Sequence, residues 1–299
     1  MKTSVDAELP NEMILRIFQY LDLQGLITAR LVNQRWRGLV PFAEIEEARK
    51  TMLDFYMDLS VSPTFHRTRE WVKKNRKSFN RETYILKLVA QYPSLPEEYR
   101  LWVLEWPEIA VIGGVWPGLA RRAYLKEHAD GVNIRPGTNW LSYPQVSTMA
   151  YADFHNQTIE AIPGILIWSQ PDYLTWLIVD ERKHLNGKLF HSGITEYRHL
   201  LEGSLGENKL QHPYDRLTPS WIAYLRELWK AIEEADKGLN LASAPNKCGV
   251  NGTEAATPIP FVIPEVQHLA GIAWKRRNSS ETTTWMSGIR ATHSFDREE

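Results

Sequence analysis

The sequence predicts an α+β protein in three parts: a small three-helix module at residues 1–43, an α+β domain with helices and an antiparallel sheet at 44–236, and a flexible C-terminal tail at 237–299. Short amphipathic helical patterns fill residues 9–40 and predict the module. Longer helical patterns, followed by apolar runs bounded by turn residues, predict the domain. From about Asp236 onward Gly, Asn, Ser, Ala, Thr and Pro dominate and periodicity fades, which is typical of a linker or tail.

Three short helices are expected in the module. Asn11, Asp22 and Asn33 are their predicted N-caps, because Asn and Asp side chains accept hydrogen bonds from the free amides of a first turn. Pro41 is expected to end the third helix. Each helix places its recurring positions on one face, and these are Ile14, Ile17, Phe18 and Leu21, then Leu23, Leu26, Ile27 and Arg30, then Trp36, Leu39 and Val40.

The module has more apolar side chains than it can bury alone. A unit below about 40 residues seldom folds without disulfides, metal or a partner. The apolar faces must therefore dock against the rest of the chain, another protein, or both. A binding role is the first hypothesis, and an ordinary N-terminal helical hairpin packed on its own domain is the alternative.

The order of residues in this segment resembles the F-box, and the matching positions are Leu9-Pro10, Glu12, Ile14-Leu15, Ile17-Phe18, Leu21, Leu26, Ala29-Arg30, Val32 and Trp36. The resemblance implies a three-helix module that docks onto the Skp-type adaptor of a cullin-based ubiquitin ligase. The residues it implies for adaptor contact or support are Leu9, Pro10, Ile14, Ile17, Phe18, Leu21, Val32 and Trp36. Gly25 departs from the family, which more often has an acidic residue there. Gly inside a helix costs about 1 kcal/mol relative to Ala, so the second helix is expected to begin late.

The first part of the body, residues 44–106, is mainly helical in pattern. Apolar residues recur on one face of four segments, 45–59, 65–72, 80–89 and 94–107. The first of these helices is expected to extend the module into the next domain. Prolines at the ends of the segments are expected to end these helices.

The second part of the body is predicted to form a sheet. An apolar, Gly-rich segment at 110–119 is expected to form a buried turn or a short strand, with Gly113-Gly114 allowing two backbones to approach closely. Residues 120–160 predict an irregular connection with short strands. Residues 164–168, 173–179 and 187–192 are expected to be antiparallel strands with tight connections, since their loops are rich in turn residues.

A final helix is predicted after the sheet. Thr218 is its expected cap, with Pro219 at the first helical position. Gly238 is the expected stop. The apolar face of this helix consists of Trp221, Leu225, Leu228, Trp229 and Ile232.

The body resembles the SUKH family, the Smi/Knr-type domains found in fungal cell-wall regulators and bacterial immunity proteins. The residues that carry this resemblance are Leu95-Pro96-Glu97-Glu98-Tyr99, the strands around Ile165 and Trp176, Ser220-Trp221 and Tyr224-Leu225. The match spans residues 50–236 in short pieces, and an unrelated α+β domain is the alternative. The resemblance implies a protein-binding fold without catalytic residues.

Composition narrows the partners. Lys and Arg total 35 against 36 Asp and Glu, a formal net charge of -1, so neither nucleic acid nor an anionic membrane is an expected partner. The first residues lack an apolar signal core, and no apolar run approaches the roughly 20 residues needed to span a bilayer, so a cytosolic or nuclear protein is expected.

Twelve tryptophans are spread along the chain, and most are expected in the core. No repeat at a fixed period follows the module.

The sequence contains no phosphate-binding loop, dinucleotide fingerprint, HExxH or GxSxG motif. The nearest candidate for metal binding or proton transfer is Asp180, Glu181, His184 and His191 around a presumed hairpin, but nothing in their spacing makes them converge. Cys248 is the single cysteine and excludes an internal disulfide or a multi-cysteine zinc site. No cofactor, metal or catalytic residue is therefore predicted.

The expected function is that of a non-catalytic substrate receptor. Residues 9–40 would bind a Skp-type adaptor and through it a cullin, while the body would bind an unknown target protein. The alternative is an interaction or regulatory protein that uses the adaptor outside a ligase, or a SUKH-like scaffold in cell-wall or stress signalling. An unrecognised enzyme on the body would need a pocket with convergent titratable groups.

Overall fold

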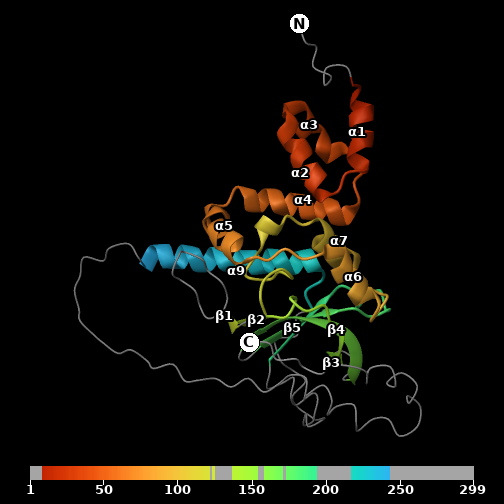
Figure 1. Cartoon of the computed structure of the whole chain (residues 1–299), viewed down its shortest axis with the longest axis vertical. Coiled ribbons are helices and arrows are strands. Elements are labelled where there is room, and N and C mark those ends of the chain that lie inside the picture. Colours follow the sequence, from red (N-terminus) through yellow and green to blue (C-terminus); the bar gives the residue numbers. More distant parts are fainter. Residues whose placement is uncertain are drawn as a thin grey trace, which may run out of the picture.

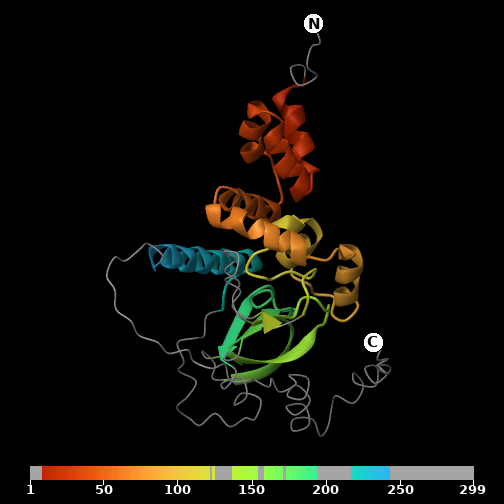
Figure 2. The same ribbon diagram turned by 60° about the vertical axis from the view of Figure 1, so that its left-hand side comes forward.

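The computed structural model describes residues 9–121, 123–124, 137–153, 158–170, 173–193 and 217–242. The N-terminal module stands at one end of the molecule, a layer of helices lies in the middle, and a sheet closes the other end (Figures 1 and 2). The predicted α+β class, with helices first and an antiparallel sheet after them, is confirmed. The expected tail lies outside the described residues from 243 onward.

The module consists of α1 (Asn11–Gln19), α2 (Leu23–Val32), α3 (Gln34–Leu39) and the short 3-10 turn η2 (Val40–Phe42). The caps at Asp22 and Asn33 are confirmed, since their side chains accept hydrogen bonds from Gly25 N at 2.7 Å and Trp36 N at 2.8 Å. The predicted cap at Asn11 is wrong. Pro10 occupies the cap position, and the Asn11 side chain accepts hydrogen bonds from Arg35 instead.

The expected late start of α2 is also wrong, because the helix begins at Leu23 directly after its cap. Gly25 therefore lies in the first turn. A Cβ there would meet Asp22 Oδ1 at 3.1 Å and Leu21 Cβ at 3.2 Å, so the missing side chain makes room for the capping carboxylate.

The helical layer contains one helix for each predicted segment, and these are α4 (Glu47–Ser60), α5 (Pro63–Asn75), α6 (Arg81–Val89) and α7 (Glu97–Glu105), followed by the 3-10 turn η3 (Glu108–Ala110). The final helix α9 (Trp221–Ala242) crosses beneath α5 and α4 (Figure 1). The buried Gly-rich turn is present. Gly113 and Gly114 have φ values of 57° and 84°, and a Cβ on Gly113 would meet Leu228 of α9 at 3.0 Å.

Both ends of α9 differ from the prediction. Ser220 caps the helix, accepting a hydrogen bond from Ala223 N at 3.3 Å, whereas Thr218 pairs with Leu189 in an isolated bridge. Gly238 does not stop the helix, which continues to Ala242. A single Gly costs helix stability without necessarily ending a helix.

The sheet is antiparallel with the strand order β1-β2-β4-β5-β6, and β3 pairs with β4 beside this path. Its strands are β1 (Ala123–Tyr124), β2 (Gly137–Asn139), β3 (Ser147–Asp153), β4 (Thr158–Gln170), β5 (Tyr173–Ile178) and β6 (Leu189–Gly193). The strands predicted around 164–168, 173–179 and 187–192 are therefore present. The short strands expected within 120–160 are present as β1 and β2, but the prediction did not anticipate the seven-residue β3 or the first part of β4.

Tryptophans form much of the core, as expected. Trp102, Trp116 and Trp221 are fully buried, and their ring centroids lie 4.8–4.9 Å apart in edge-to-face contacts around Trp102. One continuous apolar cluster joins Phe18 of the module to these rings and to the face of the sheet that packs against α9. A second, smaller cluster lies on strand positions such as Met149 and Trp176.

Candidate protein-binding site

The module has its own small core. Ile14 and Phe18 of α1 are completely buried against Leu23 and Leu26 of α2. Trp36 of α3 is half-buried and packs edge-on against Phe18, with 5.3 Å between ring centroids. Two of the eight residues predicted for adaptor contact or support therefore support the module from within.

The remaining predicted residues lie nearer the surface. Pro10, Ile17 and Val32 are exposed, while Leu9, Leu21 and Trp36 are half-buried. Arg35 fixes the start of α1, since its guanidinium donates hydrogen bonds to the Leu9 carbonyl at 2.5 Å and to the Asn11 side chain at 2.7 Å.

Besides the predicted Ile17 and Val32, the module exposes apolar side chains that were not singled out from the sequence, namely Met13, Tyr20, Leu31 and Phe42. Met13, Ile17 and Tyr20 follow one flank of α1 and are 49%, 38% and 79% exposed, and Leu31 of α2 is 72% exposed. Together with Val32 and Phe42, which are also exposed, these residues form the exposed apolar set of the module. Large contiguous patches of exposed apolar side chains are typical of protein-interaction surfaces. Their helical spacing in the sequence was visible, but which flank faces solvent depends on the packing of α1 against α2.

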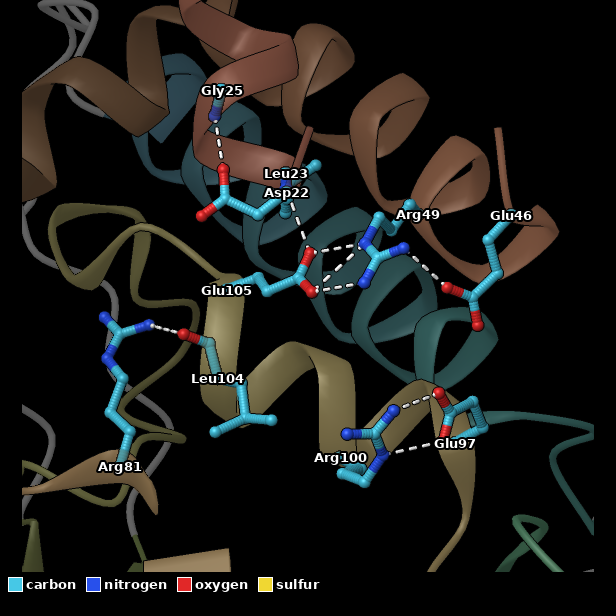
Figure 3. Close-up of polar contacts among 10 residues, drawn as sticks. All are labelled: Asp22, Leu23, Gly25, Glu46, Arg49, Arg81, Glu97, Arg100, Leu104 and Glu105. Atoms are coloured by element: carbon cyan, nitrogen blue, oxygen red, sulfur yellow. Dashed lines mark hydrogen bonds and ion pairs between the residues drawn. The ribbon is translucent and has the colours of Figure 1, made fainter. Parts of the chain in front are cut away.

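The junction between module and body is built on Glu105, at the C-terminal end of α7 (Figure 3). Its carboxylate accepts a hydrogen bond from Leu23 N, a free amide of the first turn of α2, at 2.9 Å. It also accepts hydrogen bonds from Arg49 of α4, at 2.7 Å from Nη2 and 2.8 Å from Nε. Glu105 is only 9% exposed, so these contacts replace water almost entirely.

Neighbouring charges support this junction. Glu46 pairs with Arg49 at 2.8 Å. Hydrogen bonding to Glu105 raises the pKa of Arg49 above its ordinary value. Arg100 pairs with Glu97 near the start of α7, and its hydrogen bonds lower the pKa of the Glu97 carboxyl. The Glu105 hydrogen bonds and these ion pairs join α4 and α7 of the body to the start of α2 in the module.

The polar residues considered for metal binding or catalysis do not converge. Asp180 accepts hydrogen bonds from Arg182 at 2.8 and 3.1 Å, and these lower the pKa of its carboxyl. His191 lies on β6 between the hydroxyls of Thr175 and Thr218, at 3.3 and 3.0 Å. No group of three or more potential metal ligands was found in the described part of the chain. Cys248 lies outside it.

Comparison with known proteins identifies the module. The F-box-like family model matches residues 6–41. The N-terminal module is an F-box-like domain. No curated protein and no solved structure matches the chain, and the SUKH resemblance of the body gains no support. Among the described helices, none is long and apolar enough to cross a membrane.

Proposed function

We propose that this chain is a substrate receptor of a Skp/cullin-type ubiquitin ligase. The F-box-like domain would bind a Skp-type adaptor, which in turn binds a cullin, and the α+β body would bind the target protein. The observation that carries the proposal is the match at residues 6–41 to a family of adaptor-binding domains.

The exposed apolar set supports the adaptor-binding step. Buried aliphatic and aromatic anchors supply most of the energy of a protein interface. Ile17 and Tyr20 present such side chains on α1, while Phe18 behind them keeps the helix in place.

The receptor would contribute no catalytic group of its own. Holding the target near the transferring enzyme raises the effective concentration of the two reactants. The Glu105 junction supports this role, since its contacts join the F-box-like domain directly to the body.

Co-precipitation tests the ligase assignment. Full-length protein and an Ile17→Asp variant would each be recovered from cells and probed for the adaptor and a cullin. We expect the unchanged protein to recover both the adaptor and the cullin, and the Ile17→Asp variant to recover neither. We also expect a target protein to accumulate when the gene is deleted. Adaptor without cullin would instead favour a regulatory protein that acts outside a ligase.

A further inference from the structure

An open groove lies where the F-box-like domain meets the body. One wall is α2, with Ile27 and Thr28, and the other contains Arg76 and Arg81. The groove has about 1010 Å³ of unfilled space, including open solvent, and Leu104 contributes to its apolar lining. We call it the junction groove.

The junction groove carries surplus positive charge. Arg76 and Arg81 both pair with Glu108, which is the only acidic residue among the described side chains that line it. The Arg76 side chain is 35% exposed, and its buried Nε has no acceptor among the described residues. Residues 73–81 contain five cationic and no acidic side chains, and Arg76 and Arg81 are the two of these that line the described groove. An acidic ligand is the complement of this surface.

The groove continues onto the surface of the F-box-like domain. Gln24, Ile27, Thr28 and Leu31 recur at the helical spacing that places them along one side of α2. The first three line the groove, and Leu31, one turn further, is among the most exposed apolar residues of the domain. A protein that covers the end of α2 therefore lies directly beside the groove.

We propose that the adaptor extends beyond the F-box-like domain into the junction groove, where an acidic segment of the adaptor pairs with Arg76. This proposal rests on adaptor binding as the function of the domain. Guanidinium groups form strong, directional hydrogen bonds with carboxylates. The partly buried Tyr56 and Leu104 offer an apolar surface for a neighbouring side chain of the same segment.

A charge series at Thr28 tests this proposal. Thr28 is exposed on α2, and its hydroxyl donates a hydrogen bond to the Gln24 carbonyl one turn earlier in the same helix, so we expect its substitution to leave the fold intact. Purified full-length Thr28→Glu and Thr28→Lys variants would be titrated with purified Skp-type adaptor at low and high salt. We expect Thr28→Glu to weaken and Thr28→Lys to tighten binding, each by about three- to tenfold at low salt, with smaller differences at high salt.

Thr148 supplies the matched control. It is an exposed threonine on β3, in the sheet at the opposite end of the molecule from the F-box-like domain (Figure 1), so Thr148→Glu and Thr148→Lys make the same changes in net charge far from the groove. These variants should bind the adaptor within about twofold of the unchanged protein, since exposed charges beyond a Debye length are screened. Arg76→Gln should weaken binding and Arg76→Lys should largely preserve it. Thermal unfolding would confirm that every variant is folded.

The outcomes separate this proposal from the proposed function. If the adaptor binds, Ile17→Asp abolishes binding and the Thr28 series has no effect, the groove proposal is wrong and the proposed function stands. The same holds if the series instead alters binding of a target protein. If both Thr28 variants weaken binding equally, steric contact replaces charge pairing and the proposal fails. If the unchanged protein does not bind the adaptor, both proposals fail.

Discussion

Glu105 shows how much one side chain contributes to the junction of the two parts. Its carboxylate satisfies both a backbone amide of α2 and the guanidinium of Arg49. Replacing it with Ala would leave the Leu23 amide without its acceptor and Arg49 with Glu46 alone, at a site that is mostly buried. We expect Glu105→Ala to lower the free energy of unfolding by about 2–4 kcal/mol, measured by urea denaturation.

Glu97 on the same helix is the control for this prediction. Its side chain is 48% exposed and pairs with Arg100 three residues away. Exposed pairs of this kind contribute less than about 1 kcal/mol, so Glu97→Ala should change the stability little. Equal losses for the two variants would contradict the proposed role of Glu105.

Asp180 makes stability depend on pH. Hydrogen bonds from Arg182 lower the pKa of this carboxyl in the folded protein below its ordinary value. Its contribution is therefore complete above the ordinary pKa and is lost as the pH falls through the folded pKa. We expect Asp180→Asn to be less stable than the unchanged protein at about pH 6, with the difference shrinking below about pH 4.

Urea denaturation at a series of pH values measures this difference. Glu181→Gln is the control, because the Glu181 side chain is exposed next to Asp180. A constant difference for Asp180→Asn across the acid range would show that the Arg182 contact contributes nothing.

The residue scale also shows what local sequence predicts. Asp22 and Asn33 cap the helices that follow them, because the cap and its amide are three residues apart. Asn11 and Thr218 could cap helices in the same way, but each has another partner far along the chain. Asn11 accepts hydrogen bonds from Arg35, and Thr218 pairs with Leu189. Local patterns cannot reveal such partners.

At the scale of elements, α7 links two distant helices. Glu105 at its C-terminal end accepts from the first turn of α2, and Glu98 in its first turn accepts from Ile222 N of α9 at 3.1 Å. The nine-residue helix thus satisfies free amides at the starts of both. The Glu residues were visible in the sequence, but which helices they reach follows from tertiary packing alone.

Different side chains of helix α1 stabilise the module and are proposed to bind the adaptor. Phe18 is fully buried, whereas Ile17 beside it is 38% exposed. We expect Phe18→Ala to lower the free energy of unfolding by about 3–5 kcal/mol, because it leaves a cavity beneath Trp36. Ile17→Asp should change the stability by less than about 1 kcal/mol.

Thermal and urea unfolding of the two variants measure this separation. Ile17→Asp is the cleaner probe of adaptor binding, since loss of binding by Phe18 variants can arise from unfolding of the module. A large loss of stability in Ile17→Asp would mean that the exposed flank of α1 is part of the core.

Strands were predicted less completely than helices. The runs around 173–179 and 187–192 both form strands in the structure, and these strands are buried at nearly every position on both faces. The β3 segment is STMAYAD, which has small and polar residues, and Pro163 interrupts the pattern of β4. These strands exist because they pair with each other along seven positions, a long-range contact that no local pattern contains.

At the scale of the whole molecule, the F-box-like domain packs directly against the body and is not a separate unit joined to it by a linker. Its core is continuous with the apolar cluster that contains Trp102 and Trp221, and the Glu105 contacts reinforce it. The apolar side chains of residues 9–40 therefore fall into two groups. One part packs into the body, and the exposed apolar set remains available to a partner.

Direct titration of the purified full-length protein with a purified Skp-type adaptor tests the central claim. The account predicts saturable one-to-one binding that Ile17→Asp weakens by at least about 100-fold, while thermal unfolding of the variant stays unchanged. The account would be contradicted if the folded, unchanged protein did not bind the adaptor. It would also be contradicted if the Ile17→Asp variant bound the adaptor with the same affinity as the unchanged protein.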